Sequence, residues 1–415
     1  MRILFLTQWF QPEPFFKGMP FVKALREKGH DVEVLTGFPN YPGGILYPGY
    51  RVRLFRRQIM DGIKINRVAL YPSHDKSALR RILNYVSFSL SALFIGPWLI
   101  KAPDVVYVYN LVSLGLPAFL LRYLFGAKVL IDVQDLWPES VTNSKMIRSS
   151  LVLRLLDRIC NYVYSNADQL VVLSPGFRSE LTGRGINPGR IEVIYNWCDE
   201  AGLQAEEVSD PQSAASENKF NVLFAGSMGL AQGLDTLLDC AQICQRDLPQ
   251  AVFTFVGGGV ERERLMQEAE GRKLKNVVFL PPRPMERMGE LYAAADALVV
   301  HLKDDPLFRI TVPSKTQAYL FVGKPIIMAM RGDAADLIRK AGAGIICEPE
   351  NPKEIVSAVK NLYQMSASER RKMGAAGRRF YLDSLSFEKG TSRFEMIMKD
   401  IASKNIHGAE FEKII

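Results

Sequence analysis

The sequence of 415 residues predicts an α/β protein built from two doubly wound domains that face a cleft. Short β-branched or aromatic runs alternate with amphipathic stretches, a pattern typical of parallel strands joined by helices. This order begins twice along the chain. The length also exceeds what one hydrophobic core usually supports, so two domains of about 200 residues are expected.

The first domain is expected over residues 1–199. Its first strand is RILFLT, which a helix with the sequence FVKALREKG and a second strand, DVEVLTG, follow. Further strands are expected at 105–110, 128–133 and 169–174.

Residues 200–218 are polar and rich in Ala, Ser and acidic residues, which predicts a linker. The second domain is then expected over 219–390. Its predicted strands are 221–226, 251–259, 276–280, 297–302 and 324–330. Ligands of such sheets bind beyond the carboxyl ends of the strands, so the site is expected at those ends.

Five cysteines are odd in number and form no metal-like pairs, which predicts a reducing compartment and no disulfide framework. No signal peptide is expected, because MRILFLT leads directly into a turn. These observations favour a cytoplasmic protein.

The net charge of +8 is concentrated in one stretch. Between Arg51 and Arg81, nine Lys or Arg stand against two Asp, a net charge of +7. Such a patch suits nucleic acid, an anionic membrane surface or an acceptor that carries a diphosphate.

Residues 82–100 follow this patch and contain no charge. Their length would permit a membrane span, but Asn84, Ser87 and Ser91 form a polar stripe at helical spacing. Strand-like segments on both sides also argue against a span. We expect a buried or interfacial helix, with either a membrane surface or ordinary core packing against it.

Three strand-to-helix turns of the second domain suit a phosphate. FAGSMGLAQGLD and VGGGVERERL supply glycines after strands, where backbone can approach a ligand closely. The glycine spacing of the dinucleotide fingerprint is absent, which disfavours a nicotinamide enzyme. In LFRITVPSKTQAYLFVGKPI, the strand-like run breaks at Pro313, and Ser314 and Lys315 open a helix.

The first amides of that helix lack internal partners and carry the positive end of its dipole. Arg309 and Lys315 are the cations nearest to it in sequence. Alternatively, Ser314 only caps the helix and Lys315 is solvated. Three such turns in one domain favour a nucleoside diphosphate over that alternative. A nucleic-acid-binding protein would explain the charge but not these turns, so no nucleic-acid partner is expected.

The ordered set GHDVEVLTGFPNYPGG, VIYNWCD, GSMGLAQGLD, VGGG, VVFLPP and VPSKTQAYLFVGKPII resembles the family-four retaining glycosyltransferases of the GT-B fold. The similarity covers essentially the whole chain. It is strongest to the bacterial branch that builds O-antigen or capsule units, including N-acetyl-L-fucosamine transferases. The resemblance implies two Rossmann-like domains, a nucleotide-sugar bound mainly by the second, an acceptor bound by the first, and a final helix at 391–415 that returns to the first domain.

The resemblance also implies a donor site. Its expected residues are Ser227, Met228, Gly229, Gln232, Gly257, Gly258, Arg283, Met285, Thr311, Ser314 and Gln317. Two glutamates usual in the family are replaced by Ile310 and Ala318, so Gln317 is the candidate for ribose recognition. Gln232 stands where the family usually has lysine, which leaves Lys315 and Arg309 to stabilise the departing diphosphate.

IDVQDLWPES brings a further polar group to a strand end in the first domain. Asp135 is the candidate polar partner of the transferred sugar or the acceptor hydroxyl, and the alternative is a helix-capping aspartate. The loops QWFQPEPFFKG and FPNYPGG suit a sugar face and an acidic acceptor, or are rigid turns. The expected acceptor residues are Glu13, Phe16, Lys17, Gly18, Tyr41, Trp137 and Glu139.

The resemblance thus implies a retaining transfer from a UDP-linked sugar, with UDP-N-acetyl-L-fucosamine as one candidate, to a lipid-diphosphate-linked saccharide. The protein would lie at the cytoplasmic face of the bacterial membrane. No metal or other cofactor is expected, although the acidic pair in DDP at 304–306 resembles a metal ligand set. The alternative is a sugar-nucleotide epimerase of the same fold, but the basic and apolar stretch from 51 to 100 favours a lipid-linked acceptor.

Overall fold

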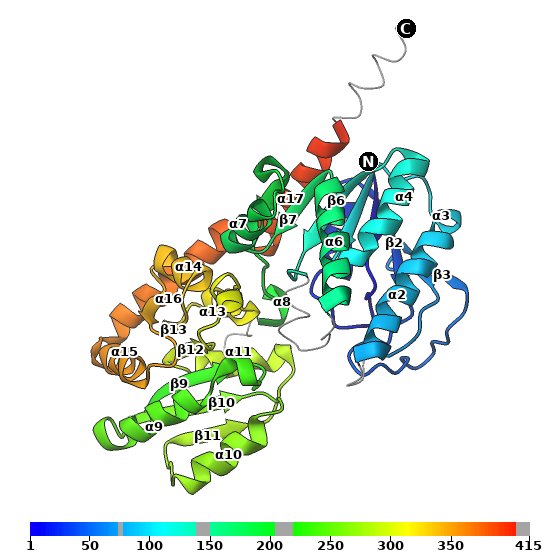
Figure 1. The fold of residues 1–415 in the computed structure, drawn as a ribbon. Coiled ribbons are helices and arrows are strands. Elements are labelled where there is room, and N and C mark those ends of the chain that lie inside the picture. The colour runs from blue at the N-terminus through cyan, green and yellow to red at the C-terminus, as the bar shows by residue number, and fades with distance from the viewer. Residues whose placement is uncertain (74–77, 138–149, 204–218, 404–415) are drawn as a thin grey trace. The chain divides into compact units, whose positions relative to one another are not determined.

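The computed structural model describes residues 1–73, 78–137, 150–203 and 219–403. The chain forms two compact units (Figure 1). Unit 1 contains Met1–Leu173, Phe177–Ile194 and the segment that begins at Thr391, and unit 2 contains Ser174–Gly176 and Tyr195–Gly390. Each unit is a mainly parallel sheet covered by helices, so the predicted α/β class with two doubly wound domains is confirmed.

Unit 1 is built on an eight-stranded sheet of order β3-β4-β2-β1-β5-β6-β7-β8. Its strands are β1 (Arg2–Leu6), β2 (Asp31–Gly37), β3 (Phe55–Met60), β4 (Ile63–Val68), β5 (Val105–Tyr109), β6 (Lys128–Val133), β7 (Gln169–Val172) and β8 (Ile191–Val193). Among the described strands of this sheet, only β3 pairs antiparallel, and it lies at the edge. The sequence did not predict β3, because this exposed strand carries arginines and little apolar alternation.

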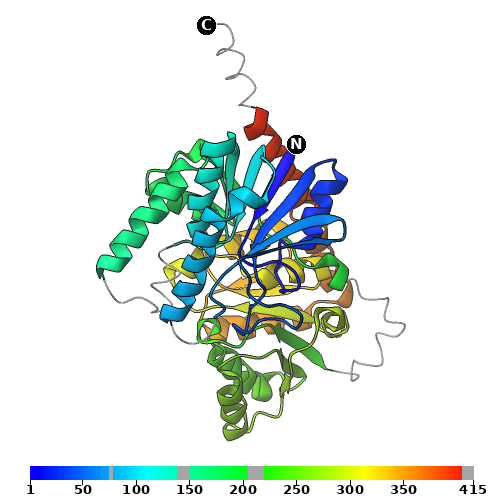
Figure 2. The ribbon, with the colours of Figure 1, turned by 90° about the vertical axis from the view of Figure 1, so that its right-hand side faces the viewer.

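Helices cover both faces of this sheet (Figures 1 and 2). They are α1 (Met19–Glu27), α2 (Ala78–Phe94), α3 (Gly96–Leu99), α4 (Gly115–Phe125), α6 (Ser150–Asn166), α7 (Pro175–Gly183) and α17 (Phe387–Ser403), with short 3-10 turns η1 (Val112–Leu114) and η2 (Pro188–Arg190). Phe21 of α1 and Phe394 of α17 pack together over Tyr107 of β5 on one face. The helices α2 and α4 pack together on the other.

The uncharged run predicted as a buried or interfacial helix forms α2 and α3. Asn84, Phe88 and Ala92 of α2 recur every fourth residue and are fully buried. Within the described ranges, the chain contains no helix whose length and apolar character would let it cross a membrane.

Unit 2 is built on a wholly parallel sheet of order β11-β10-β9-β12-β13-β14. The strands are β9 (Phe220–Ala225), β10 (Ala251–Val256), β11 (Val277–Leu280), β12 (Ala297–His301), β13 (Ile326–Ala329) and β14 (Gly344–Cys347). The longer helices are α9 (Asp235–Asp247), α10 (Arg262–Gly271), α13 (Ser314–Val322), α14 (Asp333–Ala341), α15 (Pro352–Gln364) and α16 (Ala367–Ser384).

The other described helical elements of unit 2 are three short helices, α8 (Glu200–Leu203), α11 (Met288–Ala293) and α12 (Pro306–Arg309), and two 3-10 turns, η3 (Leu230–Gln232) and η4 (Met285–Arg287). The helices α9 and α15 pack together on one face of the sheet, and α13, α14 and α16 pack together on the other. The core between the sheet and α9 includes Cys240 and Cys244.

All five cysteines are free and buried. Burial raises the pKa of Cys244 to about 11 and that of Cys347 to about 12. Both thiols therefore stay protonated at neutral pH.

Two glycine turns meet at the carboxyl edge of unit 2. Gly226 follows β9 and donates its N–H to the carbonyl of Val256 at 2.9 Å. A Cβ added to Gly257 would lie 2.0 Å from the carbonyl oxygen of Gly226, and the φ of Gly257 is +139°. The two turns therefore pack backbone against backbone, which only glycine permits here.

We expect Gly257→Ala to lower the free energy of unfolding by about 2–4 kcal/mol, because the new Cβ would clash and the positive φ would be strained. Urea denaturation measures the change. The matched control is Gly271→Ala, where a Cβ meets nothing within 4 Å. Gly271 ends α10, so this control should leave stability unchanged or raise it slightly. Equal effects of the two substitutions would contradict the close packing of the turns.

Candidate active site

The helix α13 begins at Ser314, directly after Pro313, as the sequence predicts. No side chain caps this helix in the described chain, so the first amide N–H groups stay available to a ligand. Ser314 and Ser227 are both exposed. The sheet is parallel, so the turns after β9, β10 and β12 lie at its same edge.

Lys315 on the first turn of α13 carries an enclosed ammonium. Its Nζ lies 3.8 Å from the centroid of the Phe224 ring and is buried without a hydrogen-bond partner among the described residues. A Cβ added to Gly226 would lie 3.2 Å from this nitrogen, so the lysine lies directly beneath the first glycine turn. Burial lowers the pKa of Lys315 to about 7. A buried cation with no counter-ion fits a site for an anion.

A chain of hydrogen bonds holds the turn after β9. The Oε1 of Gln232 accepts the N–H of Gly229 at 3.0 Å, and the carbonyl of Gln232 lies 2.6 Å from the Nδ1 of His301. The Nε2 of His301 accepts the N–H of Glu350, so the ring is neutral and its Nδ1 donates. Burial lowers the pKa of His301 and keeps it neutral. Gln232 and Gly229 therefore shape the turn. Both were predicted to contact the donor, and this is wrong for the groups that bond within the protein.

Four other predicted residues also need correction, because their groups have partners inside the protein. Arg309 forms a bidentate pair with Asp304, at 2.8 and 2.9 Å. The hydroxyl of Thr311 donates to the carbonyl of Leu307. Met228 is fully buried in the core.

Gln317, the fourth, is 2 % exposed, so it cannot bind a ribose as predicted. In the orientation that satisfies its amide, the nitrogen donates to the carbonyl oxygens of Pro313 and Ser314, at 2.9 and 3.0 Å. Its side chain stabilises the start of α13 instead. A sequence gives little indication that a glutamine will bond to the backbone of its own helix, because a glutamine near the start of a helix also suits a ligand contact.

The remaining donor candidates keep positions at the edge. Gly257 is buried beneath the first turn, and Gly258 accepts the N–H of Met228 through its carbonyl at 2.7 Å. Arg283 and Met285 follow β11 and are exposed. The structure thus brings Ser227, Ser314 and Lys315 to one edge of the sheet with a single enclosed cation.

In unit 1, Glu13 joins the two loops at 8–18 and 38–44. Its Oε1 accepts the N–H groups of Asn40 and Tyr41, both at 2.8 Å, and its Oε2 accepts that of Phe10 at 3.0 Å. The side chain is 1 % exposed, so the prediction of a direct acceptor contact is wrong. Burial raises the pKa of Glu13 to about 7, although these three amides and Arg67 act in the opposite direction.

Lys17 is also fully buried, where the sequence predicts an acceptor contact. It forms an ion pair with Asp132, which also accepts the hydroxyl of Tyr107. Gln134 donates to the second oxygen of Asp132 at 2.6 Å. Gly18 is buried as well, and a Cβ added there would meet the side chain of Gln11. These groups hold the loop after β1 and do not present a charge to an acceptor.

An aromatic cluster lies at the carboxyl ends of β1 and β2. Trp9 and Phe15 stack with centroids 4.9 Å apart, and Tyr41 lies 4.9 Å from Phe15. The ring centroid of Tyr85 in α2 lies 5.8 Å from that of Trp9 and 6.3 Å from that of Trp137, so Tyr85 connects the two tryptophans. The predicted Tyr41 and Trp137 are thus brought into one cluster, and Phe16 is partly buried.

Trp9 and Phe15 were predicted only in general terms, as aromatics of the loop QWFQPEPFFKG that suit a sugar face, and not as individual acceptor residues. Tyr85 was not predicted, because it lies within an apolar helix. The Nε1 of Trp9 is buried without a hydrogen-bond partner among the described residues. Asp135 is exposed just after β6, and Glu139 lies outside the described residues.

Comparisons with known proteins agree with this architecture. A sequence model of the glycosyl transferase 4-like domain matches residues 19–197, and one of glycosyl transferases group 1 matches residues 206–380. These matches cover most of both units. The chain therefore belongs to the glycosyltransferases of the GT-B fold.

Two named relatives come from bacteria. WbjE of Pseudomonas aeruginosa, a probable glycosyltransferase by name, is 26% identical over 60% of this chain and 63% of its own length. WcaI of Escherichia coli (strain K12), named for colanic acid biosynthesis as a glycosyl transferase, is 24% identical over 82% of this chain and 86% of its own. The chain thus spans less than two thirds of the first relative.

A solved structure from E. coli, described as trehalose-6-phosphate bound with UDP-2-fluoro glucose, has a TM-score of 0.74 to this chain. It is 14% identical and covers 96% of this chain and 99% of its own. At this identity the likeness supports the fold alone.

Removing the enclosed charge should stabilise the free protein. The pKa of Lys315 is lower in the folded chain than in the unfolded chain, so folding opposes its protonation. We expect Lys315→Met to raise the free energy of unfolding by about 1–3 kcal/mol at pH 7. The gain should shrink as the pH rises from 7 and vanish only above pH 10.5, where the lysine is neutral in both the folded and the unfolded chain.

Urea denaturation at several pH values measures this gain. Lys389→Met is the control, because Lys389 is exposed and should leave stability unchanged. A loss of stability in Lys315→Met would show that the amine is paired in the free protein.

Proposed function

We propose that this glycosyltransferase moves a sugar from a UDP-linked donor to a lipid-diphosphate-linked saccharide, with retention of anomeric configuration. The observation that carries the proposal is the enclosed ammonium of Lys315 beneath the glycine turn at Gly226. A diphosphate at this edge would be the counter-ion of Lys315 and would accept hydrogen bonds from the first amide N–H groups of α13.

The donor would place its pyrophosphate over Ser227 and the start of α13. The acceptor hydroxyl would attack the anomeric carbon on the face from which the diphosphate leaves. The bond from that carbon to the phosphate oxygen breaks, and the hydroxyl proton passes to the departing phosphate. Lys315 and the amides of α13 would stabilise the negative charge that grows on this leaving group.

Unit 1 would bind the acceptor. Its aromatic cluster of Trp9, Phe15, Tyr41, Tyr85 and Trp137 offers flat apolar faces on which sugar rings pack. Asp135 is exposed after β6 and remains the candidate partner of the acceptor hydroxyl.

The wider role proposed is the synthesis of a surface polysaccharide at the cytoplasmic face of the bacterial membrane. Support comes from WcaI, which is named for colanic acid biosynthesis, and from the basic stretch 51–81. N-acetyl-L-fucosamine, which the sequence resemblance suggests, is the first donor sugar to test. We further propose that the reaction needs no metal, since the cation of Lys315 would take the place of a metal at the diphosphate.

The test is an incubation of the full chain with UDP-sugars, with and without membrane lipid extract. We expect UDP release only with the lipid, and no loss of activity in a chelator. Lys315→Met should lower turnover more than about tenfold, which corresponds to at least about 1.4 kcal/mol of stabilisation of the departing group. The control Lys389→Met should keep full turnover.

Three outcomes would oppose parts of the proposal. Conversion of the donor sugar without an acceptor would favour the epimerase, and a strict need for magnesium or manganese would refute the metal-free step. Unchanged turnover in Lys315→Met would remove the role of this lysine.

The affinity for UDP should fall as the pH rises above 7. The free protein loses the proton of Lys315 near this pH, whereas a bound diphosphate would hold the proton in place. Binding above pH 7 therefore takes up a proton, and we expect up to about a tenfold loss of affinity per pH unit between pH 7 and 9.

Titration calorimetry in buffers of different ionisation enthalpy measures both the affinity and the proton uptake. Lys315→Met should bind UDP weakly and without this pH dependence. Affinity that stays constant from pH 7 to 9 in the unaltered protein would contradict contact between Lys315 and the diphosphate.

A further inference from the structure

The outer side of α2 and α3 carries an apolar ridge. Every exposed residue between positions 82 and 99 is apolar. With Leu79 at the start of α2, these residues form the ridge: Leu79, Leu83, Val86, Leu90, Phe94 and Trp98. The five on α2 fall within about 80° of the helix circumference at 100° per residue. They lie opposite the buried Asn84, Phe88 and Ala92.

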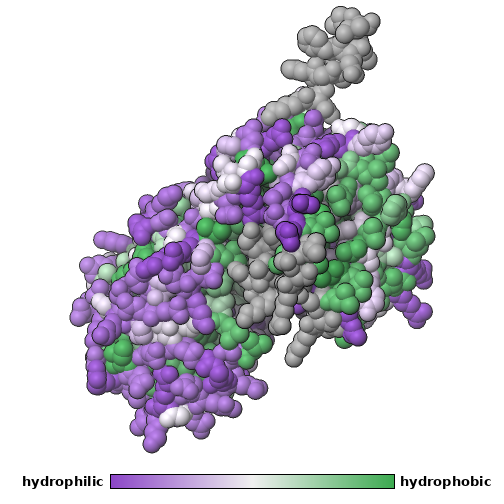
Figure 3. Space-filling model, viewed as in Figure 1, coloured by the Kyte–Doolittle hydropathy of each residue, from purple (hydrophilic) through white to green (hydrophobic). Residues whose placement is uncertain are grey.

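This ridge is unusual for a surface helix, whose outer side is normally polar. Phe94 is 68 % exposed and Trp98 is 82 % exposed. Figure 3 shows apolar residues gathered over the part of unit 1 that α2, α3 and α4 form. Apolar surface that is continuous in this way marks an interaction site.

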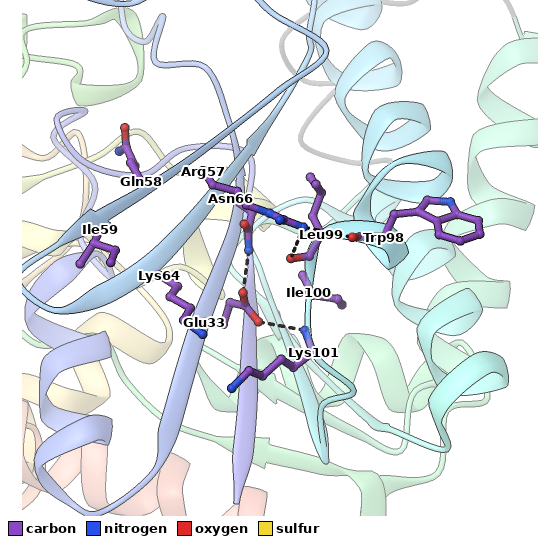
Figure 4. A pocket seen from close by; sticks show the side chains of 10 residues that line it. All are labelled: Glu33, Arg57, Gln58, Ile59, Lys64, Asn66, Trp98, Leu99, Ile100 and Lys101. Atoms are coloured by element: carbon purple, nitrogen blue, oxygen red, sulfur yellow. Dashed lines mark hydrogen bonds between the residues drawn. The ribbon is translucent and has the colours of Figure 1, made fainter.

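A basic pocket adjoins the end of the ridge at Trp98 (Figure 4). It has a volume of about 750 Å³. Its lining comes from β2, β3, β4 and the segment 98–101, and consists of Glu33, Arg57, Gln58, Ile59, Lys64, Asn66, Trp98, Leu99, Ile100 and Lys101. The guanidinium of Arg57 donates to the carbonyl of Trp98 at 3.2 Å, which joins β3 to α3. In Figure 4 the indole of Trp98 points away from the polar residues of the pocket.

The charges of the pocket are unbalanced. Arg57, Lys64 and Lys101 stand against the single carboxylate of Glu33. The oxygens of Glu33 accept the amide of Asn66 at 2.9 Å and the backbone N–H of Lys101 at 3.1 Å. No ion pair of Lys64 or Lys101 occurs within the described part of the chain, so both ammonium groups are available to an anion.

We propose that the apolar ridge and the basic pocket dock unit 1 on an anionic phospholipid bilayer. The ridge would lie in the boundary between headgroups and acyl chains, as the apolar side of an interfacial helix does. Trp98 would sit at the membrane surface, and a lipid phosphate would bind Lys64 and Lys101. The charge selects this partner, because a cationic pocket beside an apolar ridge complements an anionic headgroup above an acyl chain.

Further positive charge lies in the same stretch of sequence as Arg57 and Lys64. Arg51, Arg53 and Arg56 precede or belong to β3 and are exposed. Not all of the basic stretch contributes, because Arg67 is fully buried and donates to the carbonyl of Gly37 at 2.7 Å.

The membrane docking rests on the proposed function, because that function includes a contact with the membrane. Neither the donor nor the acceptor takes part in the docking, so the docking and the glycosyl transfer can fail separately.

The test is cosedimentation of the full chain with vesicles of phosphatidylcholine alone or mixed with phosphatidylglycerol, at low and high salt. We expect binding to the anionic vesicles and weaker binding at high salt. Leu90→Ser/Phe94→Ser should weaken binding about tenfold or more. The matched control is Leu382→Ser/Met396→Ser, which removes apolar groups of similar exposure elsewhere and should bind as the unaltered chain does.

Lys64→Glu/Lys101→Glu should abolish the preference for anionic vesicles, and Lys372→Glu/Lys389→Glu is the charge-matched control on unit 2. Trp98 also provides a direct signal, since it is 82 % exposed, whereas Trp137 is partly buried and Trp9 and Trp197 are at most 5 % exposed. The tryptophan emission should shift to shorter wavelength on vesicle binding, and Trp98→Phe should remove most of this shift.

Several results would overturn the inference. They are no binding to anionic vesicles, equal binding to neutral ones, or equal loss in ridge and control variants. A change of oligomeric state in Leu90→Ser/Phe94→Ser, measured by sedimentation, without vesicle binding by the unaltered chain would show that the ridge joins two copies. Retained glycosyl transfer to a soluble acceptor by a ridge variant would leave the proposed function intact.

Discussion

An enclosed ammonium group that has no counter-ion among the described residues is the constraint on which the carboxyl edge of unit 2 depends. Lys315 lies against the ring of Phe224 and beneath Gly226, where a Cβ would lie 3.2 Å from its Nζ, and the two glycine turns pack backbone against backbone. The bonded chain through Gln232 and His301 holds the first of these turns. The free protein therefore keeps an unfavourable charge in a shaped site, which is a common feature of preorganised binding sites.

Unit 1 uses its buried charges differently, because each has a partner. Glu13 joins two loops through three amides, Lys17 pairs with Asp132, and Arg67 bonds to backbone carbonyls. These groups fix the positions of loops whose aromatic side chains form the cluster around Trp9. The contrast separates a unit whose buried charges maintain structure from a unit in which the buried ammonium of Lys315 has no hydrogen-bond partner among the described residues.

The alternation of strands and helices, the start of α13 and the uncharged helix followed from local patterns, so the sequence predicted them well. The edge strand β3 was not predicted, since exposed edge strands lack a clear alternation of apolar and polar residues. Side-chain partners were the harder part of the site. Glu13, Lys17 and Gln317 are polar residues near strand ends, and only the packed structure shows that their polar groups turn inward. Tyr85 was missed because a contact between distant segments leaves no local pattern.

The burial of every cysteine has a practical consequence for spectroscopy. Since the five native thiols are enclosed and those with a shifted pKa stay protonated, a maleimide reagent would find little to modify in the folded chain. A cysteine introduced at an exposed position would then be the main reactive group. Fluorescent or spin labels could thus report on single sites without first replacing the native sulfur atoms.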